Sequence, residues 1–176
     1  DSHRLLDIQP GKAVQRAIQV AAHALAEARH LGLQHRVLGQ PAEVNRHAAD
    51  ALGLVADVRL WDRPLFYCAM PGTTGDNPNW VRRKANTVQR LHKSTYRLVL
   101  EAGNGERSFP PHRGLPAEDF VIAGGGFPIR VKGVGVIGAV TVSGLHERDD
   151  HEVVVAAICD CLGLDRAAFA LPPATI

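Results

Sequence analysis

The stretch that decides the fold is GGGFPIRVKGVGVIGAVTVSG, residues 124–144. Two β-rich runs, 127–131 and 134–142, flank the turn residues Lys132 and Gly133, and this pattern predicts a β-hairpin. The letters GVGVIG, which start at this turn, match the dinucleotide-binding pattern G-x-G-x-x-G. That pattern requires a helix directly after the glycines, whereas this chain continues AVTV. We therefore interpret the glycines as a sign of close strand packing, or of a surface that a ligand approaches.

A second hairpin is predicted on the N-terminal side of the first. The β-rich runs 54–60 and 65–70 are joined by WDRP at 61–64, which is a turn-forming connection. Because hairpins pair their strands antiparallel, the two segments together favour one antiparallel sheet. Helices packed on such a sheet make an α+β fold, which is the fold class we expect.

The remaining segments complete this pattern. Apolar residues spaced at three and four positions predict amphipathic helices, and Asn, Asp, Pro and Gly at their ends provide start and stop signals. The predicted helices cover 12–31, 42–52, 78–93 and 150–162, and a further strand covers 96–100. A loop over 101–119 is the longest irregular segment, and loops of this length are often functional.

Composition limits the class of protein. A chain of 176 residues is typical of one domain, so we expect a single domain over 1–176. The net charge of +2 is too small for a general nucleic-acid binder, and the apolar runs are too short to span a membrane. Three cysteines imply no disulfide framework and favour a reducing compartment, so we expect a cytoplasmic protein.

Two segments carry groups that suit an acidic ligand. Trp80 lies beside Arg82, Arg83 and Lys84 on one predicted helix, and the arginine fork matches a carboxylate or a phosphate. A solvated or subunit-contacting face explains the same charges. The glycines at 124–126 could present consecutive amides to an anion or to the edge of a planar ligand, or they could form a flexible turn.

One compact cluster combines histidine and carboxylate, because His146 and His151 flank Glu-Arg-Asp-Asp. Neutral imidazole is a common iron or zinc ligand, and an aspartate could orient it. The alternative is that the aspartates cap the last helix and His151 lies on its surface. His92 ends the basic helix, where an imidazolium suits the helix dipole. Cys159 and Cys161 point to opposite sides of a helix, so the two thiols would not chelate one metal together.

Four segments together are similar to one known family: PGTTGDNPNWVRRK at 71–84, AGGGFPI at 123–129, GAVTVSG at 138–144 and DH at 150–151. They resemble the haem-degrading-domain family, in its uncharacterised branch with a yeast member. The resemblance covers about 55–163, whereas residues 1–50 match weakly. It implies a profilin-like α/β/α sandwich around an antiparallel sheet, and homo-oligomers. Some relatives bind haem through a histidine, and a position that is often histidine in the family is Ala123 here.

The resemblance and the residue types suggest two functions. The first is binding of haem or a tetrapyrrole, with or without its oxidative breakdown. The candidate ligand-binding residues are Trp80, Arg82, Arg83, Lys84, Gly124, Gly125, Phe127 and Ile129, and the candidate iron ligands are His151 first and His92 second. The cations would pair with the propionates, and the apolar side chains would contact the macrocycle.

The alternative function is a non-catalytic oligomeric module that binds protein partners or a small anionic metabolite. It is motivated by the chain's lack of a G-x-S-x-G or H-E-x-x-H motif. A third function, thiol chemistry at Cys68, would need charged neighbours that activate the thiol. Whether the protein is an enzyme is left open by these residues.

Overall fold

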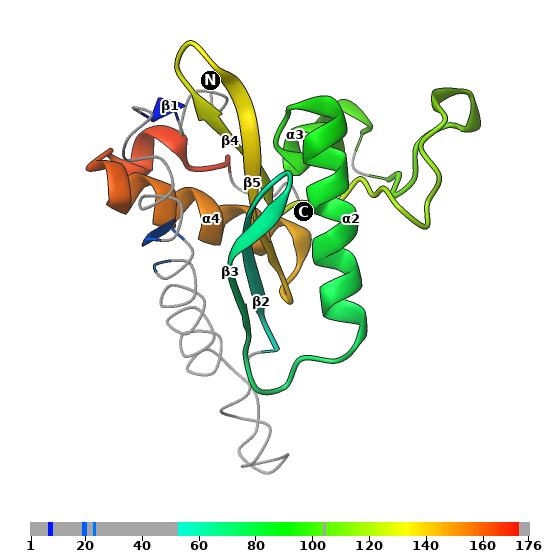
Figure 1. Ribbon diagram of the computed structural model, residues 1–176, viewed down its shortest axis with the longest axis horizontal. Coiled ribbons are helices and arrows are strands. Elements are labelled where there is room, and N and C mark those ends of the chain that lie inside the picture. The colour runs from blue at the N-terminus through cyan, green and yellow to red at the C-terminus, as the bar shows by residue number, and fades with distance from the viewer. Residues whose placement is uncertain (1–6, 9–18, 21–22, 24–52, 104, 173–176) are drawn as a thin grey trace.

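The computed structural model describes residues 7–8, 19–20, 23, 53–103 and 105–172. In that part of the chain, five strands form one sheet in the order β1-β4-β5-β2-β3 (Figure 1). The strands are β1 (Asp7–Ile8), β2 (Val55–Leu60), β3 (Arg63–Ala69), β4 (Gly126–Val131) and β5 (Gly135–Ser143). The helices are α2 (Asp76–Leu91), α3 (Thr95–Glu101) and α4 (Glu147–Leu162), with two 3-10 turns, η3 (Pro111–Arg113) and η4 (Arg166–Phe169).

The centre of the sheet is the hairpin that residues 124–144 predict. Strands β4 and β5 pair antiparallel, with Phe127 opposite Val140, and β5 also pairs antiparallel with β2. Gly138 permits the close approach of β2, because a Cβ atom there would lie 2.1 Å from the carbonyl oxygen of Arg59. The interpretation as close strand packing is therefore confirmed for Gly138. Gly133 and Gly135 have φ values of +78° and +112°, and among the described residues no atom crowds a Cβ there.

Helices cover both faces of this sheet (Figure 1). Successive strand residues point to opposite faces, so Phe127 faces α4 while Gly126 lies against Val88 of α2. The buried cluster on the α4 face includes Val153, Ala157, Ile158, Phe127 and Val140. The expected α/β/α sandwich around antiparallel strands is thus confirmed for β2 to β5. The two-residue strand β1 was not expected, and it pairs parallel with β4 at one edge.

The strand predicted over 96–100 is wrong, because these residues belong to helix α3. Tyr96 and Val99 are buried three positions apart, which is helical spacing, but a segment this short does not reveal its period. Thr95 helps to place the helix, since its hydroxyl accepts the Gly126 amide at 2.9 Å.

The helix starts also differ from prediction. Helix α2 begins at Asp76, before the predicted Pro78. Helix α4 begins at Glu147, and its N-cap is His146 rather than an aspartate. Of the helix predicted over 12–31, residues 19–20 and 23 are described and are helical. The rest of that helix and the one predicted over 42–52 lie outside the described residues. None of the helices in the described part of the chain is both long and apolar enough to cross a membrane.

Candidate functional site

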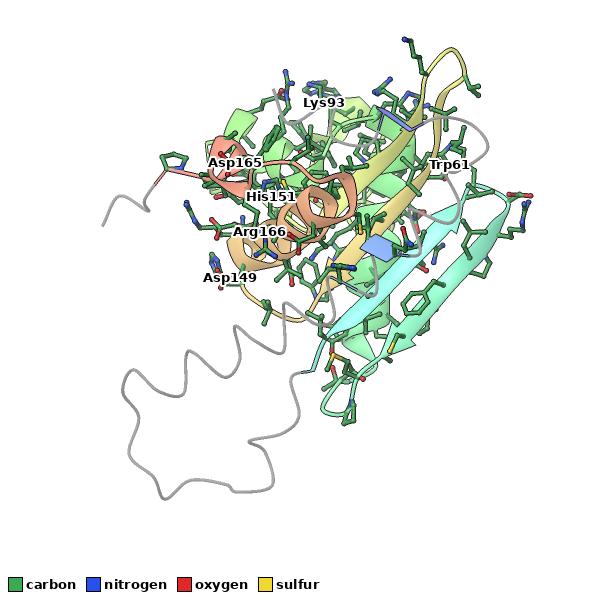
Figure 2. All side chains as sticks on the ribbon, turned by 90° about the vertical axis from the view of Figure 1, so that its left-hand side faces the viewer. Trp61, Lys93, Asp149, His151, Asp165 and Arg166 are labelled. Carbon is green, nitrogen blue, oxygen red and sulfur yellow. The ribbon has the colours of Figure 1, made fainter. Side chains whose placement is uncertain are left out.

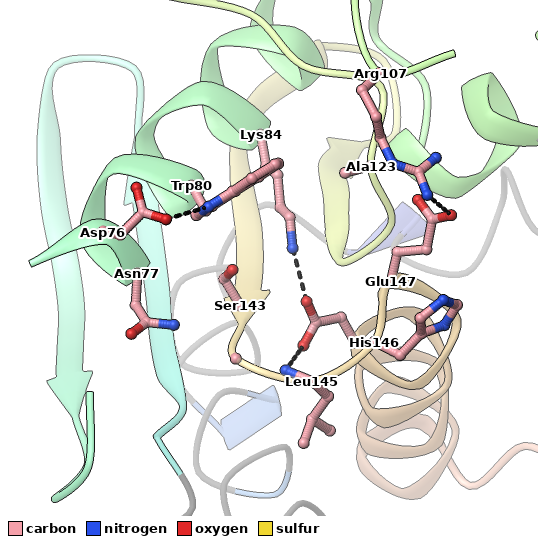
Figure 3. Close-up of a pocket in the computed structure, with 12 residues that line it drawn as sticks. Asp76, Asn77, Trp80, Lys84, Arg107, Ala123, Ser143, Leu145, His146 and Glu147 are labelled. Atoms are coloured by element: carbon pink, nitrogen blue, oxygen red, sulfur yellow. Dashed lines mark hydrogen bonds and ion pairs between the residues drawn. The ribbon is translucent and has the colours of Figure 1, made fainter. Parts of the chain in front are cut away.

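A cavity of about 300 Å³ lies between the start of α2 and the start of α4 (Figure 3). One wall is the first turns of α2, and the opposite wall is the turn 143–147 that leads from β5 into α4. Arg107 and Ala123, from the connection between α3 and β4, complete the lining that the structure describes. The cavity therefore joins segments that are far apart in the sequence.

A buried ion pair forms the base of the cavity. Lys84 Nζ donates to Asp150 Oδ2 at 2.7 Å and to the Val142 carbonyl oxygen at 3.0 Å, and both charged side chains are 2% exposed. Asp150 Oδ1 accepts the Leu145 amide at 3.0 Å. Burial raises the pKa of Asp150, and the ammonium of Lys84 opposes that rise. The pair ties α2 to α4 and holds the turn 143–147 in place.

The glycines before β4 make room for this ion pair. Gly125 has a φ of +108°, and a Cβ atom there would lie 2.4 Å from the Val142 oxygen and 3.1 Å from Lys84 Nζ. A Cβ atom at Gly124 would lie 2.1 Å from the Glu147 carbonyl oxygen. Both glycines are buried, so close packing of the start of α4 accounts for them.

Trp80 provides a flat surface in the α2 wall. Its indole Nε1 donates to Asp76 Oδ2 at 2.8 Å, and the Arg83 guanidinium lies over the ring, 4.9 Å from the centroid. These two contacts hold the indole in one orientation, since a charge over the ring and a hydrogen bond at its edge both resist rotation. The indole is partly exposed and borders the cavity.

The opening of the cavity carries a second ion pair. Arg107 Nη2 lies 2.8 Å from Glu147 Oε1, with side chains 47% and 12% exposed. The other oxygen, Glu147 Oε2, is buried and has no hydrogen-bond partner among the described residues. His146 is exposed beside it, and its Nδ1 accepts the Arg148 amide at 3.5 Å. The opening therefore holds one half-exposed guanidinium and one exposed imidazole.

Only some of the residues that the sequence analysis selected line the cavity. Trp80 and Lys84 line it. Arg82 instead bonds Asp119 Oδ1 at 2.7 Å on the surface, and Phe127 and Ile129 are buried in the core. Sequence reasoning missed Arg107, Glu147 and the pairing of Asp150, and it did not select His146 as a ligand. Trp80 and Lys84 gave a signal in the sequence, because they lie with Arg82 and Arg83 on one predicted helix that suits an acidic ligand.

The two histidines selected as iron ligands do not line this cavity. His151 is 4% exposed and is stacked between Tyr96 and Phe127, at centroid distances of 4.7 and 4.9 Å. Burial lowers the pKa of His151 to about 4, with a smaller effect from Arg148. His92 is exposed in the left-handed conformation at the end of α2, with φ at 55°. Within the described residues, no group of three or more metal-ligating side chains is arranged to hold a metal ion.

Comparison with known structures supports the fold. The structure of the Ybr137w protein superposes with a TM-score of 0.60 at 19% identity, covering 84% of this chain and 76% of that one. A heme complex of PduOC superposes with a TM-score of 0.53 at 18% identity, covering 79% and 90% of the two chains. Sequence identities this low establish a shared fold only.

Comparison of sequences defines the family. The UPF0303 protein mlr5144 of Mesorhizobium japonicum is 55% identical over 126 residues, which is 72% of this chain and 75% of that protein. Residues 36–159 match the family model described as haem degrading protein HbpS-like, in agreement with the resemblance that the four sequence segments carry. The chain therefore belongs to the HbpS-like family of haem-degrading proteins.

Proposed function

We propose that the chain binds haem, or a related flat tetrapyrrole with acidic side groups, in the cavity between α2 and α4. The observation that carries the proposal is the meeting of an indole surface, Trp80, with the half-exposed guanidinium of Arg107 at one cavity. The family match and the heme complex of a structural relative support this choice of ligand.

The residues around the cavity fit such a ligand in chemistry. The indole of Trp80 would face the ring system, because its orientation is already held by Asp76 and Arg83. Arg107 is half-exposed and lies 2.8 Å from Glu147 through Nη2. A guanidinium has five N–H donors, so those not used by Glu147 would pair with a propionate carboxylate. Asp76 and His146 at the rim are exposed, so one edge of a large ring can enter while the rest projects outwards.

His146 is our candidate for the iron ligand, because it is a histidine that borders the cavity. Coordination through Nε2 places the ring proton on Nδ1, whereas Nδ1 now accepts the Arg148 amide at 3.5 Å. That contact is at the long limit for a hydrogen bond, so exchanging it for an iron bond costs little. Haem iron, when bound, supplies electron-transfer or oxygen chemistry. His151 and His92 remain candidates that the same experiment tests.

The test is a titration of the purified protein with hemin, followed at the Soret band. We expect a shifted Soret band with saturable binding. Trp80→Ala and Arg107→Ala should each weaken binding about tenfold, because each removes a contact of roughly the strength of one charge-assisted or stacking interaction. His146→Ala should change the Soret position, since it would remove the proposed iron ligand.

Two variants serve as matched controls for the histidine. His92→Ala and His151→Phe should leave the Soret position of the complex unchanged, because neither side chain borders the cavity. A wild-type protein that leaves the hemin spectrum unchanged contradicts the proposal. A Soret position that moves only in the His92 or His151 variant would place the iron away from His146.

We also propose that the chain forms homo-oligomers, and one observation supports this. Strand β3 is an edge of the sheet, and it carries Tyr67 with 48% of its surface exposed. An edge strand with an exposed aromatic residue is a template for pairing with another chain. Light scattering should therefore report an oligomer that Tyr67→Lys weakens, and a monomeric wild-type protein would contradict this.

A further inference from the structure

Positively charged side chains gather at the end of the molecule where α2 ends and where β4 turns into β5. Arg90 is exposed in the last turn of α2, and Lys93 follows that helix. Arg97 lies on α3, and Arg130 of β4 joins them, because its Nη2 donates to the His92 carbonyl oxygen at 3.4 Å. In Figure 2, Lys93 and the tip of the hairpin between β4 and β5 both lie at the upper end of the molecule. We call this region the basic end and define it by Arg90, Lys93, Arg97, Arg130 and Lys132.

Positive charge is in excess at the basic end. The carboxylate bonded to it is that of Glu101 on α3, since Lys93 Nζ lies 2.9 Å from Oε2 and Arg97 Nε lies 2.6 Å from Oε1. These two hydrogen bonds lower the pKa of Glu101, so one carboxylate is shared between two cations. Arg90 and Lys132 are exposed, and neither forms an ion pair with any residue that the structure describes. The basic end therefore attracts anions.

The hairpin tip adds apolar surface to the same end. Val134 lies in the turn, where its amide donates to the Val131 carbonyl oxygen at 3.1 Å, and 67% of its surface is exposed. Leu100 follows Arg97 by three positions on α3 and is 52% exposed. A single exposed apolar residue is ordinary on a protein surface. Exposed apolar residues beside a group of Lys and Arg are instead typical of surfaces that enter the headgroup region of a bilayer.

We propose that the basic end docks on the surface of a membrane that contains anionic lipids. Each cation close to such a surface strengthens binding about fivefold, and the Val134 side chain would enter the boundary between headgroups and acyl chains. A projecting hairpin turn fits a flat surface, whereas an acidic peptide is held in a groove or along a strand edge, so we favour a membrane over a peptide. The cavity lies at the start of α2, away from the basic end (Figure 1), and none of the five cations lines it.

The test is co-sedimentation of the protein with vesicles of phosphatidylcholine, either alone or mixed with phosphatidylserine. We expect binding to the mixed vesicles only. Binding should be lost when salt rises from about 0.1 M to about 1 M, because the Debye length falls from about 10 Å to about 3 Å. Arg90→Gln combined with Lys132→Gln breaks no ion pair among the described residues and should weaken binding about 25-fold. Val134→Trp should bind more tightly than the wild type, and mixed vesicles should shift the fluorescence of its new indole to the blue, because indole favours the membrane interface.

The matched control removes two charges from other surfaces. Arg82 is 43% exposed near the start of α2, and Arg113 is exposed in η3. Arg82→Gln combined with Arg113→Gln should therefore bind mixed vesicles as the wild type does. Hemin binding should be unchanged in the variants of the basic end, and a failure of hemin binding would contradict only the proposed haem site.

Four results would overturn the docking proposal. The mixed vesicles fail to sediment the wild-type protein, or the control variant loses as much affinity as the variant of the basic end. The fluorescence of Val134→Trp stays the same as vesicles are added. Finally, soluble polyglutamate binds the protein as tightly as the mixed vesicles do, which would identify an acidic polypeptide as the partner.

Discussion

The start of α4 buries two consecutive polar residues in opposite ways. Asp150 faces the polar cavity and meets the Lys84 ammonium at 2.7 Å, so an opposite charge compensates its burial. His151 faces the aromatic side chains of Tyr96 and Phe127, and no described residue bonds its Nδ1. Burial in that case favours the uncharged ring.

This difference separates a side chain fixed by an ion pair, Asp150, from one held by packing, His151. A buried ion pair with further hydrogen bonds fixes the elements that carry it, because removing either partner leaves an uncompensated charge. The neutral imidazole of His151 has no such partner among the described residues, and packing alone holds it. The cavity between α2 and α4 therefore has a fixed base, whereas the His151 ring is held by stacking against Tyr96 and Phe127.

The largest effect expected is loss of the ion pair. Lys84→Met leaves the Asp150 carboxylate buried without its cation, so we expect the free energy of unfolding to fall by about 3–5 kcal/mol. Urea denaturation measures it. The control is Arg82→Ala, which breaks the exposed pair with Asp119, 43% and 53% exposed, and should cost at most about 1 kcal/mol.

A double variant tests whether the cost comes from the unpaired charge. Lys84→Met combined with Asp150→Leu should recover much of the stability, because an apolar pair of similar volume replaces the ion pair without a buried charge. Equal losses for Lys84→Met and Arg82→Ala would show that the pair is not the fixed base inferred here.

A smaller, pH-dependent effect is expected from His151. Its pKa is about 4 in the folded protein against about 6.5 when unfolded. Between these values the unfolded chain binds more protons, so stability falls as the pH drops from 6.5 towards 4. The contribution lost amounts to about 3 kcal/mol. It should appear as a difference between wild type and His151→Phe in unfolding experiments at pH 7 and pH 4. A constant difference across this range would contradict the buried, neutral imidazole.

The sequence pattern was sufficient to predict secondary structure where a segment is long enough to show its helical or alternating period. The hairpin over 124–144 and the helices around Trp80 and Val153 follow from alternating or helical spacing. The seven residues of α3 were misassigned because Tyr96 and Val99 fit a strand by composition and a helix by spacing. Only the contact between Thr95 and Gly126, which forms when the layers pack, distinguishes the helix from a strand.

The site was less accessible to prediction than the fold. Trp80 and Lys84 were selected for an acidic ligand, and both border the cavity. Arg107 was not selected, because a lone arginine in a loop carries no pattern. His146 was recognised as part of the His/carboxylate cluster, but sequence alone does not show which histidine of that cluster borders a cavity. The sequence suggests His151 either as an iron ligand or as a surface residue, and the structure places it in the interior, outside the lining of the cavity between α2 and α4.

By itself, the sequence determined the α+β class, the two hairpins and the family, since each depends on neighbours within about twenty residues. Tertiary structure alone decided that Lys84 pairs with Asp150, that Arg107 meets Glu147, and that His151 is neutral. The physical reason is that charge, burial and hydrogen bonding of a side chain depend on groups from distant segments, and their identity appears only once the layers pack together.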